Sequence, residues 1–113
     1  MLTVISPAKT LDFEALPTTS KSSLPSFSKQ TKELVSIMRK KSPKELSSLM
    51  GISPKLAELN VARYQRFKER SKIGKPAISA FKGDVYIGLD ADSYSERDFT
   101  FAQKSIRILS GLY

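Results

Sequence analysis

Two helix-start signals separated by one helix-stop signal constrain the fold of this chain most. In both Ser42-Pro43 and Ser53-Pro54, the serine suits the N-cap position and the proline suits the first helical position. Gly51 lies between them and permits the positive φ angle with which many helices end. The pattern therefore predicts two helices, over residues 43–50 and 54 to about 70, joined by a tight turn.

The residues around this turn match the pattern of helix-hairpin-helix segments in DNA-binding proteins. Four leucines are predicted to pack across the hairpin, Ile52 to fill the space between its helices, and Ala57 to let them approach closely; the leucines are Leu46, Leu49, Leu56 and Leu59. Any helical hairpin with a glycine turn needs such apolar residues, so an architectural role stays open. Residues 43–70 form the predicted helix-hairpin-helix subregion.

The start of the second helix is predicted to bind phosphate, because free backbone N–H groups there lie at the positive end of the helix dipole. Contacts of this kind hold a nucleic-acid backbone without reading bases, so the predicted binding is independent of DNA sequence. Ser53 replaces the second glycine that is usual in such hairpins. The predicted DNA-binding residues are Gly51, Ser53, Lys55, Arg63, Arg66 and Arg70, of which the three arginines share one helix face.

The distribution of charge agrees with a polyanionic partner. The net charge is +8, and residues 21–75 contain 14 Lys and Arg against 4 Asp and Glu, whereas the remainder contains 5 against 7. Such a basic region is typical of nucleic-acid binding, although a solvated helical surface gives the same pattern. The chain contains no Cys and no His, so we predict no disulfide and no transition-metal site. No run of acidic residues has the spacing of an EF-hand loop, and Gly83-x4-Gly88 lacks the Lys-Ser/Thr of a P-loop, so we predict no other metal site and no cofactor.

The rest of the chain predicts an α/β (mixed α+β) fold. Residues 2–5 and 77–81 are predicted strands, and a helix is expected from about Phe27. Residues 83–88 fit either a strand or a helical turn. A last helix is predicted after Ser95, with an apolar stripe of Phe99, Ala102, Ile106, Leu109 and Leu112. Two strands are too few for an independent sheet, so we expect residues 1–113 to be an incomplete portion of a larger single domain.

A second group of candidate residues follows the two predicted strands. Lys9 and Lys82 lie at strand-to-loop positions, which often line ligand crevices in α/β proteins. With neighbouring polar residues they are predicted to form an anion-binding or catalytic cleft; these neighbours are Ser6, Thr10, Asp84 and Tyr86. Alternatively, the glycines and Pro7 here serve turns and the lysines are only solvated.

Three ordered segments give the chain a family resemblance. Residues 5–12 (ISPAKTLD), 80–89 (AFKGDVYIGL) and 101–113 (FAQKSIRILSGLY) resemble motifs of the YaaA family, and the resemblance covers all 113 residues. It implies the N-terminal portion of one YaaA-type domain, from a cytoplasmic bacterial protein that protects against hydrogen peroxide. It also implies a basic cleft and DNA binding through a helix-hairpin-helix, with no established enzymatic activity.

Three hypotheses follow for function. The first is a protein of peroxide defence that binds double-stranded or structured DNA. The second is an enzyme that acts on a nucleic acid or a phosphorylated substrate in the Lys9/Lys82 cleft, and the third is docking of an acidic protein on the basic face. No signal-peptide pattern and no stretch near about 18 apolar residues is found, so we expect a cytoplasmic protein without a membrane span.

Overall fold

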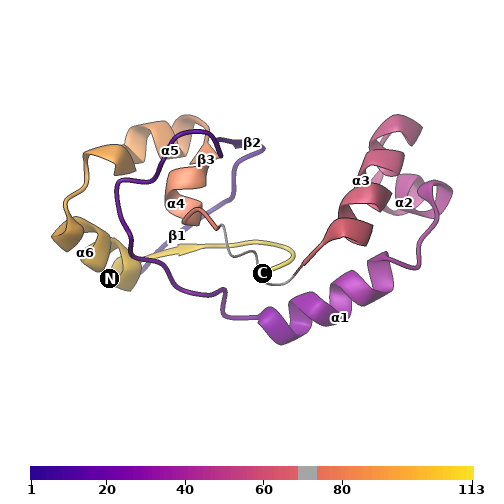
Figure 1. The fold of residues 1–113 in the computed structure, drawn as a ribbon, viewed down its shortest axis with the longest axis horizontal. Coiled ribbons are helices and arrows are strands. Elements are labelled where there is room, and N and C mark those ends of the chain that lie inside the picture. Colours follow the sequence, from indigo (N-terminus) through magenta and orange to yellow (C-terminus); the bar gives the residue numbers. More distant parts are fainter. Residues whose placement is uncertain (69–73) are drawn as a thin grey trace. The chain divides into compact units, whose positions relative to one another are not determined.

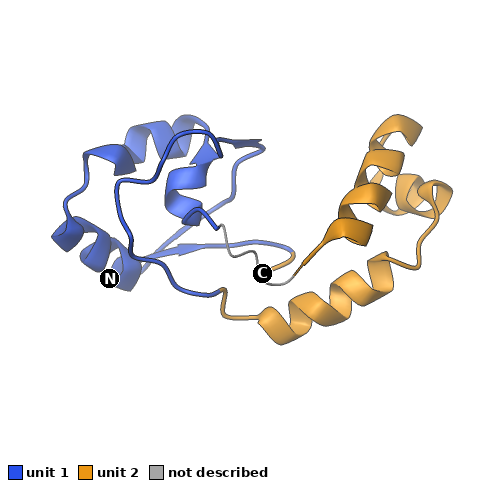
Figure 2. Cartoon of the chain, viewed as in Figure 1, with its two compact units in different colours: residues 1–24, 72–111 blue, residues 25–71, 112–113 orange. Residues whose placement is uncertain are grey.

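The computed structural model describes residues 1–68 and 74–113, and the chain forms two compact units (Figures 1 and 2). The first unit comprises Met1–Leu24 and Lys72–Gly111, and the second comprises Pro25–Ser71 with Leu112–Tyr113. Most of the second unit, Pro25–Ser71, therefore lies in sequence between the two segments of the first.

The second unit contains three helices: α1 (Ser28–Met38), α2 (Pro43–Met50) and α3 (Pro54–Arg66). The predicted start signals of α2 and α3 are confirmed. The Ser42 hydroxyl accepts the Glu45 N–H at 3.2 Å, while the Glu45 carboxylate accepts the Ser42 N–H at 2.8 Å. Ser53 caps α3 in the same position, and its hydroxyl accepts the Leu56 N–H at 3.3 Å. These local bonds explain why the sequence pattern located both helices.

Few side chains of the α2–α3 hairpin are fully buried. Leu46 of α2 and Ala57 of α3 are fully buried where the two helices pack together. The other three leucines that we predicted to pack across the hairpin are partly exposed, with exposed fractions of 65% for Leu49, 48% for Leu56 and 45% for Leu59. Among the residues of this hairpin, only Leu46 and Ala57 are fully buried where α2 packs against α3.

Two small sheets organise the first unit. Strand β1 (Thr3–Ile5) pairs in parallel with β4 (Ile106–Ile108), and β2 (Thr10–Leu11) pairs antiparallel with β3 (Phe81–Lys82). The prediction that the apolar stripe of the last helix continues through Ile106 is wrong, because α6 (Glu96–Ser105) ends one residue earlier. The alternating Ile106 and Ile108 suit a strand, and backbone pairing with β1 favours that conformation over a longer helix.

Short helices lie on both sides of β3 in sequence, before α6 begins. Residues 77–80, predicted as a strand, instead form α4 (Ala77–Ala80), and α5 (Asp84–Leu89) and the 3-10 helix η1 (Ala91–Ser93) follow. The strand prediction fails because the Pro76 carbonyl accepts the N–H groups of both Ser79 and Ala80, which closes a helical turn. A run of four apolar or small residues cannot distinguish the two conformations by periodicity.

The core of the first unit is built from small and aromatic side chains, namely Ala80, Tyr86, Ala91, Phe99 and Ala102. The aromatic rings pack in pairs: Phe81 lies 5.3 Å from Tyr86, and Tyr94 lies 5.5 Å from Phe99, between centroids. Within residues 1–68 and 74–113, no helix has both the length and the apolar character that crossing a bilayer requires.

Candidate nucleic-acid interface

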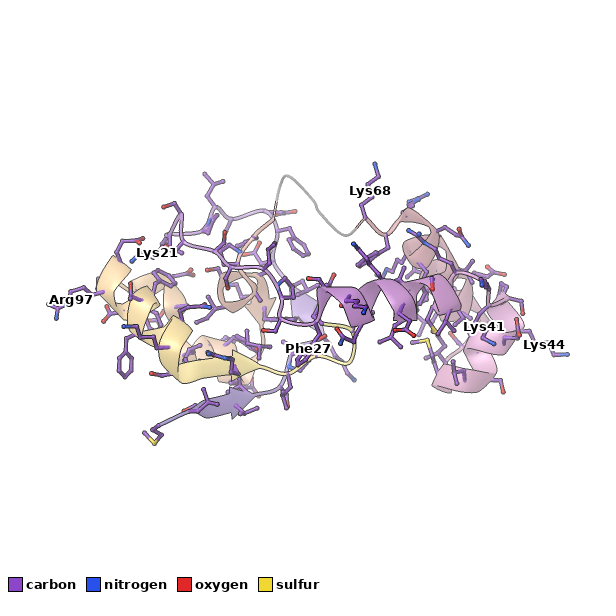
Figure 3. All side chains as sticks on the ribbon, turned by 90° about the horizontal axis from the view of Figure 1, so that it is seen from below. Lys21, Phe27, Lys41, Lys44, Lys68 and Arg97 are labelled. Carbon is purple, nitrogen blue, oxygen red and sulfur yellow. The ribbon has the colours of Figure 1, made fainter. Side chains whose placement is uncertain are left out.

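Positive charge is concentrated in the second unit. Its sequence contains eleven Lys and Arg against four Asp and Glu, a net charge of +7, whereas the first unit contains eight against seven, a net charge of +1. In Figure 3, Lys44 of α2 and Lys68, which follows α3, extend away from the ribbon. The helices of the second unit are therefore the candidate interface with a polyanion.

The turn between α2 and α3 is held by Ser47. Gly51 adopts the left-handed conformation with φ 63° and ψ 36°. The N–H groups of Gly51 and Ile52 both donate to the Ser47 carbonyl, the latter at 3.2 Å. The Ser47 hydroxyl in turn donates to the Ile52 carbonyl at 2.6 Å. The turn is thus fixed by backbone and side-chain bonds to one residue, which our sequence analysis did not identify.

The first turn of α3 retains two unused backbone donors. Pro54 has no N–H, and the Leu56 N–H, which we expected to be free, is taken by the Ser53 hydroxyl. The N–H groups of Ser53 and Lys55 make no hydrogen bond to the residues that the structure describes. The Ser53 hydroxyl proton also remains free to donate. These groups lie together at the positive end of a helix of 13 residues.

Three predicted cations follow along the exposed side of α3. Lys55 and Arg66 project within about 20° of each other around the helix and about 16 Å apart along it, and Arg63 lies about 60° away from Arg66. All three are exposed and form no ion pair with another described residue. The sixth predicted residue, Arg70, lies outside the described residues. The exposed Leu59 lies between Lys55 and Arg66 on this face.

Arg39 has a different role from the other cations of this unit. Its Nε donates to the Tyr64 carbonyl at 2.8 Å, and its Nη2 donates to the Phe67 carbonyl. The side chain of Gln65 donates back to the Arg39 carbonyl at 2.9 Å. Arg39 therefore binds carbonyls at the negative end of α3, which fixes this end to the end of α1. This role depends on tertiary contacts and has no signal in the sequence.

Glu45 offsets part of the charge on α2. It accepts hydrogen bonds from Ser42 and lies 3.7 Å from the Lys41 ammonium group. The bonds from Ser42, with a smaller effect of Lys41, lower the pKa of Glu45 below its ordinary value. The carboxylate therefore stays ionised at neutral pH and neutralises Lys41, away from the start of α3.

In the first unit, four of the six cleft candidates form two separate pairs. Thr10 and Lys82 are partners in the β2–β3 register, and the Tyr86 hydroxyl donates to the Ser6 carbonyl at 2.6 Å. Burial raises the pKa of the Tyr86 hydroxyl, so it remains a proton donor at neutral pH. The side chains of Lys9 and Asp84 are exposed and form no salt bridge with a described residue.

Some of these cleft candidates make contacts that stabilise the first unit. The Lys82 ammonium group lies 3.6 Å from the Asp92 carboxylate. Gly83 has φ 154°, and a Cβ at this position would lie 3.4 Å from the Ala8 Cβ. The backbone at Gly83 therefore passes close to the loop between β1 and β2. Among the described residues, no group of three acidic side chains comes close enough together to hold a metal ion.

Comparisons with known proteins agree on one family. The family model described as "Peroxide stress protein YaaA" matches residues 1–113. A UPF0246 protein from Aromatoleum aromaticum is 51% identical over 115 residues, which span 100% of this chain and 44% of the relative. The chain therefore spans less than half the length of the curated relative that it matches.

Proposed function

Since the chain belongs to the peroxide stress protein YaaA family, we propose that it binds DNA through the α2–α3 hairpin and does so in the response to hydrogen peroxide. The binding is to phosphates and is independent of base sequence. One observation carries the proposal: the unused N–H groups of Ser53 and Lys55 stand at the start of α3, beside exposed cations, in the unit that holds almost all of the net charge.

The geometry supports a backbone contact in two steps. The fixed turn at Gly51 presents the start of α3, where a phosphate oxygen can accept the N–H groups of Ser53 and Lys55 together with the Ser53 hydroxyl. Arg66 then lies about 16 Å further along the same face, a distance that spans several phosphates of one strand. Main-chain donors and flexible cations do not distinguish bases, so duplexes of different sequence are expected to bind alike.

The test is the salt dependence of duplex affinity, measured by fluorescence anisotropy. If Lys55, Arg63 and Arg66 each neutralise one phosphate, log K falls against log salt concentration with a slope of about −2.7 from these residues alone. The double substitution Lys55→Glu/Arg66→Glu removes two of them and should reduce the slope by about 1.8. Circular dichroism verifies that the variant is folded.

A matched control makes the same change of charge elsewhere. Lys9→Glu/Arg107→Glu alters the net charge equally but lies in the first unit and breaks no salt bridge between described residues, so it should weaken duplex binding much less. Equal weakening by both double variants would contradict a hairpin interface and would indicate only a general effect of net charge.

The enzymatic alternative rests on the cluster around Lys82. The pairing of Thr10 with Lys82 supports it, whereas the bond from Tyr86 to Ser6 and the ion pair of Lys82 with Asp92 favour a structural role. Turnover of a phosphorylated substrate that is lost in Lys82→Ala, with duplex affinity retained, would establish the alternative.

A further inference from the structure

One face of α6 combines two cations with an exposed aromatic ring. Arg97, Phe101 and Lys104 are spaced i, i+4 and i+7, which places them within about 60° around the helix. The Phe101 side chain is 71% exposed. We call these three residues the α6 face. It belongs to the first unit, so it is separate from the α2–α3 hairpin in the second.

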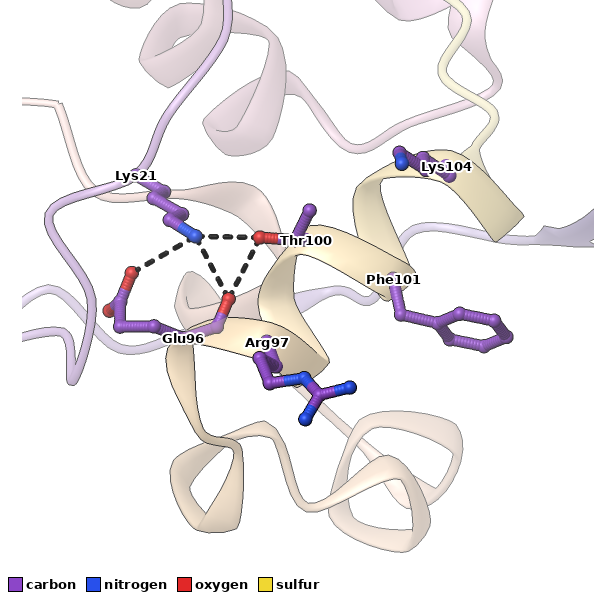
Figure 4. A pocket seen from close by; sticks show the side chains of 6 residues that line it. All are labelled: Lys21, Glu96, Arg97, Thr100, Phe101 and Lys104. Carbon is purple, nitrogen blue, oxygen red and sulfur yellow. Dashed lines mark hydrogen bonds and ion pairs between the residues drawn. The ribbon is translucent and has the colours of Figure 1, made fainter.

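Of the two carboxylates near the α6 face, Glu96 is neutralised by Lys21, while Asp98 lies next to Arg97 in sequence and accepts hydrogen bonds from Ser95. The Lys21 ammonium group lies 3.5 Å from the Glu96 carboxylate and donates to the Glu96 carbonyl at 2.9 Å and to the Thr100 hydroxyl at 2.6 Å (Figure 4). These residues and the α6 face line a shallow surface pocket of about 350 Å³. Three cations against one paired carboxylate leave the pocket with a net charge of +2.

The cations of the α6 face remain available to a ligand. Neither Arg97 nor Lys104 forms a salt bridge with a residue in the described part of the chain. Figure 4 shows Arg97 and Phe101 extending from α6 without a dashed contact, while Lys21 faces Glu96 and Thr100. The arrangement therefore offers two positive charges on either side of an unstacked ring.

We propose that the α6 face binds single-stranded DNA, with one unpaired base stacked on Phe101 and the adjacent phosphates bound by Arg97 and Lys104. An exposed aromatic ring between cations is the arrangement with which proteins bind single strands. Bases inside a duplex are stacked on their neighbours, so the ring selects unpaired nucleotides. An acidic protein would satisfy the cations but gives no reason for an exposed ring at their centre.

The chain contains a natural control for the ring alone. Phe13 is 68% exposed, almost as much as Phe101, but its neighbours in sequence are Asp12 and Glu14. An exposed phenylalanine beside acidic residues repels a phosphate backbone. The two phenylalanines therefore separate the effect of an exposed ring from that of a ring between cations.

The first experiment compares Phe101→Ala and Phe13→Ala in the intact protein, using labelled oligo(dT) and an abasic strand with the same number of phosphates. Loss of one stacked base should weaken oligo(dT) binding by roughly 5- to 150-fold in Phe101→Ala. Binding of the abasic strand, binding of duplex DNA and the oligo(dT) affinity of Phe13→Ala should all stay within about twofold of the native protein.

A second experiment observes the stack directly. The chain contains no Trp, so Phe101→Trp introduces a single indole whose fluorescence should be quenched by oligo(dT) and unchanged by the abasic strand. Lys104→Glu in this background should weaken the binding of both strands, since it removes a phosphate contact.

Three results would overturn the proposal. The first is native-like oligo(dT) binding by Phe101→Ala. The second is equal weakening of oligo(dT) and the abasic strand by this substitution. The third is an indole that oligo(dT) does not quench but that an acidic protein does, which would identify the α6 face as a protein-docking surface. Because Lys55→Glu/Arg66→Glu leaves α6 intact, adding these two substitutions to Phe101→Trp should not change the quenching of the indole by oligo(dT), whether or not the hairpin binds duplex DNA.

Discussion

Substitution of Gly51 by alanine should destabilise the α2–α3 hairpin through the backbone alone. Gly51 has φ 63°, and no heavy atom lies within 4 Å of the position that a Cβ would occupy. The added methyl group therefore clashes with no neighbour. The free-energy cost arises only from the left-handed conformation, which costs an L-residue about 1–2 kcal/mol. Alanine also restricts the unfolded chain, which offsets about 0.4–1 kcal/mol. We expect a net loss of about 1 kcal/mol.

Gly88 provides a control in which the same substitution has the opposite sign. It lies within α5, its φ is not positive, and it too has open space around a Cβ. Alanine is favoured over glycine in a helix by about 0.5–1 kcal/mol, so Gly88→Ala should stabilise the protein. Asparagine tolerates the left-handed conformation, so Gly51→Asn should cost less than Gly51→Ala.

Native-state amide hydrogen exchange is the appropriate assay, because it resolves the opening of each unit separately. The Ile52 N–H, which is bonded to the Ser47 carbonyl, reports on the turn. In Gly51→Ala, its exchange should accelerate by about fivefold, which corresponds to about 1 kcal/mol. Unchanged or slower exchange at Ile52 would refute the reasoning, since the left-handed conformation would then carry no cost.

Three further predictions concern the fold. Leu46→Ala should lower the free energy of unfolding of the second unit by about 2–5 kcal/mol, measured by urea denaturation, because it leaves a cavity against Ala57. Tyr86→Phe should cost about 1 kcal/mol in the same assay, since it removes the hydrogen bond to the Ser6 carbonyl. Hydrogen bonds from Ser95 lower the pKa of Asp98 below 3.8, so an NMR titration of this carboxyl group should have its midpoint below 3.8. The ionised carboxylate stabilises the folded protein fully above pH 3.8, and this contribution is lost as the pH falls through the lowered pKa.

The parts of the fold that depend on local bonds were predictable from the sequence. Ser42, Ser53 and Ser95 each accept an N–H three residues ahead, and such caps operate within one turn of chain. The start of each of the three helices was therefore predicted correctly. The end of α2 was equally clear, since Gly51 supplies the left-handed residue that closes it.

The parts that depend on distant partners were not predictable. Ile106 fits the helical stripe before it, and only pairing with Thr3 of β1 assigns it to a strand. The exposure of Leu56 likewise depends on how α2 packs against α3. For the candidate sites, the sequence indicated which cations are available, but it could not indicate that Arg39 is used by the carbonyls of Tyr64 and Phe67.

The parallel pairing of β1 with β4 has a consequence for the order of folding during synthesis. Thr3 is made about a hundred residues before its partner Ile106. The α2–α3 hairpin needs only contacts between neighbours in sequence and can close while the chain is still growing. Because the chain is synthesised at about 5–20 residues per second, β1 stays unpaired for several seconds before β4 is made. During that interval, β1 is unpaired and open to association with other chains.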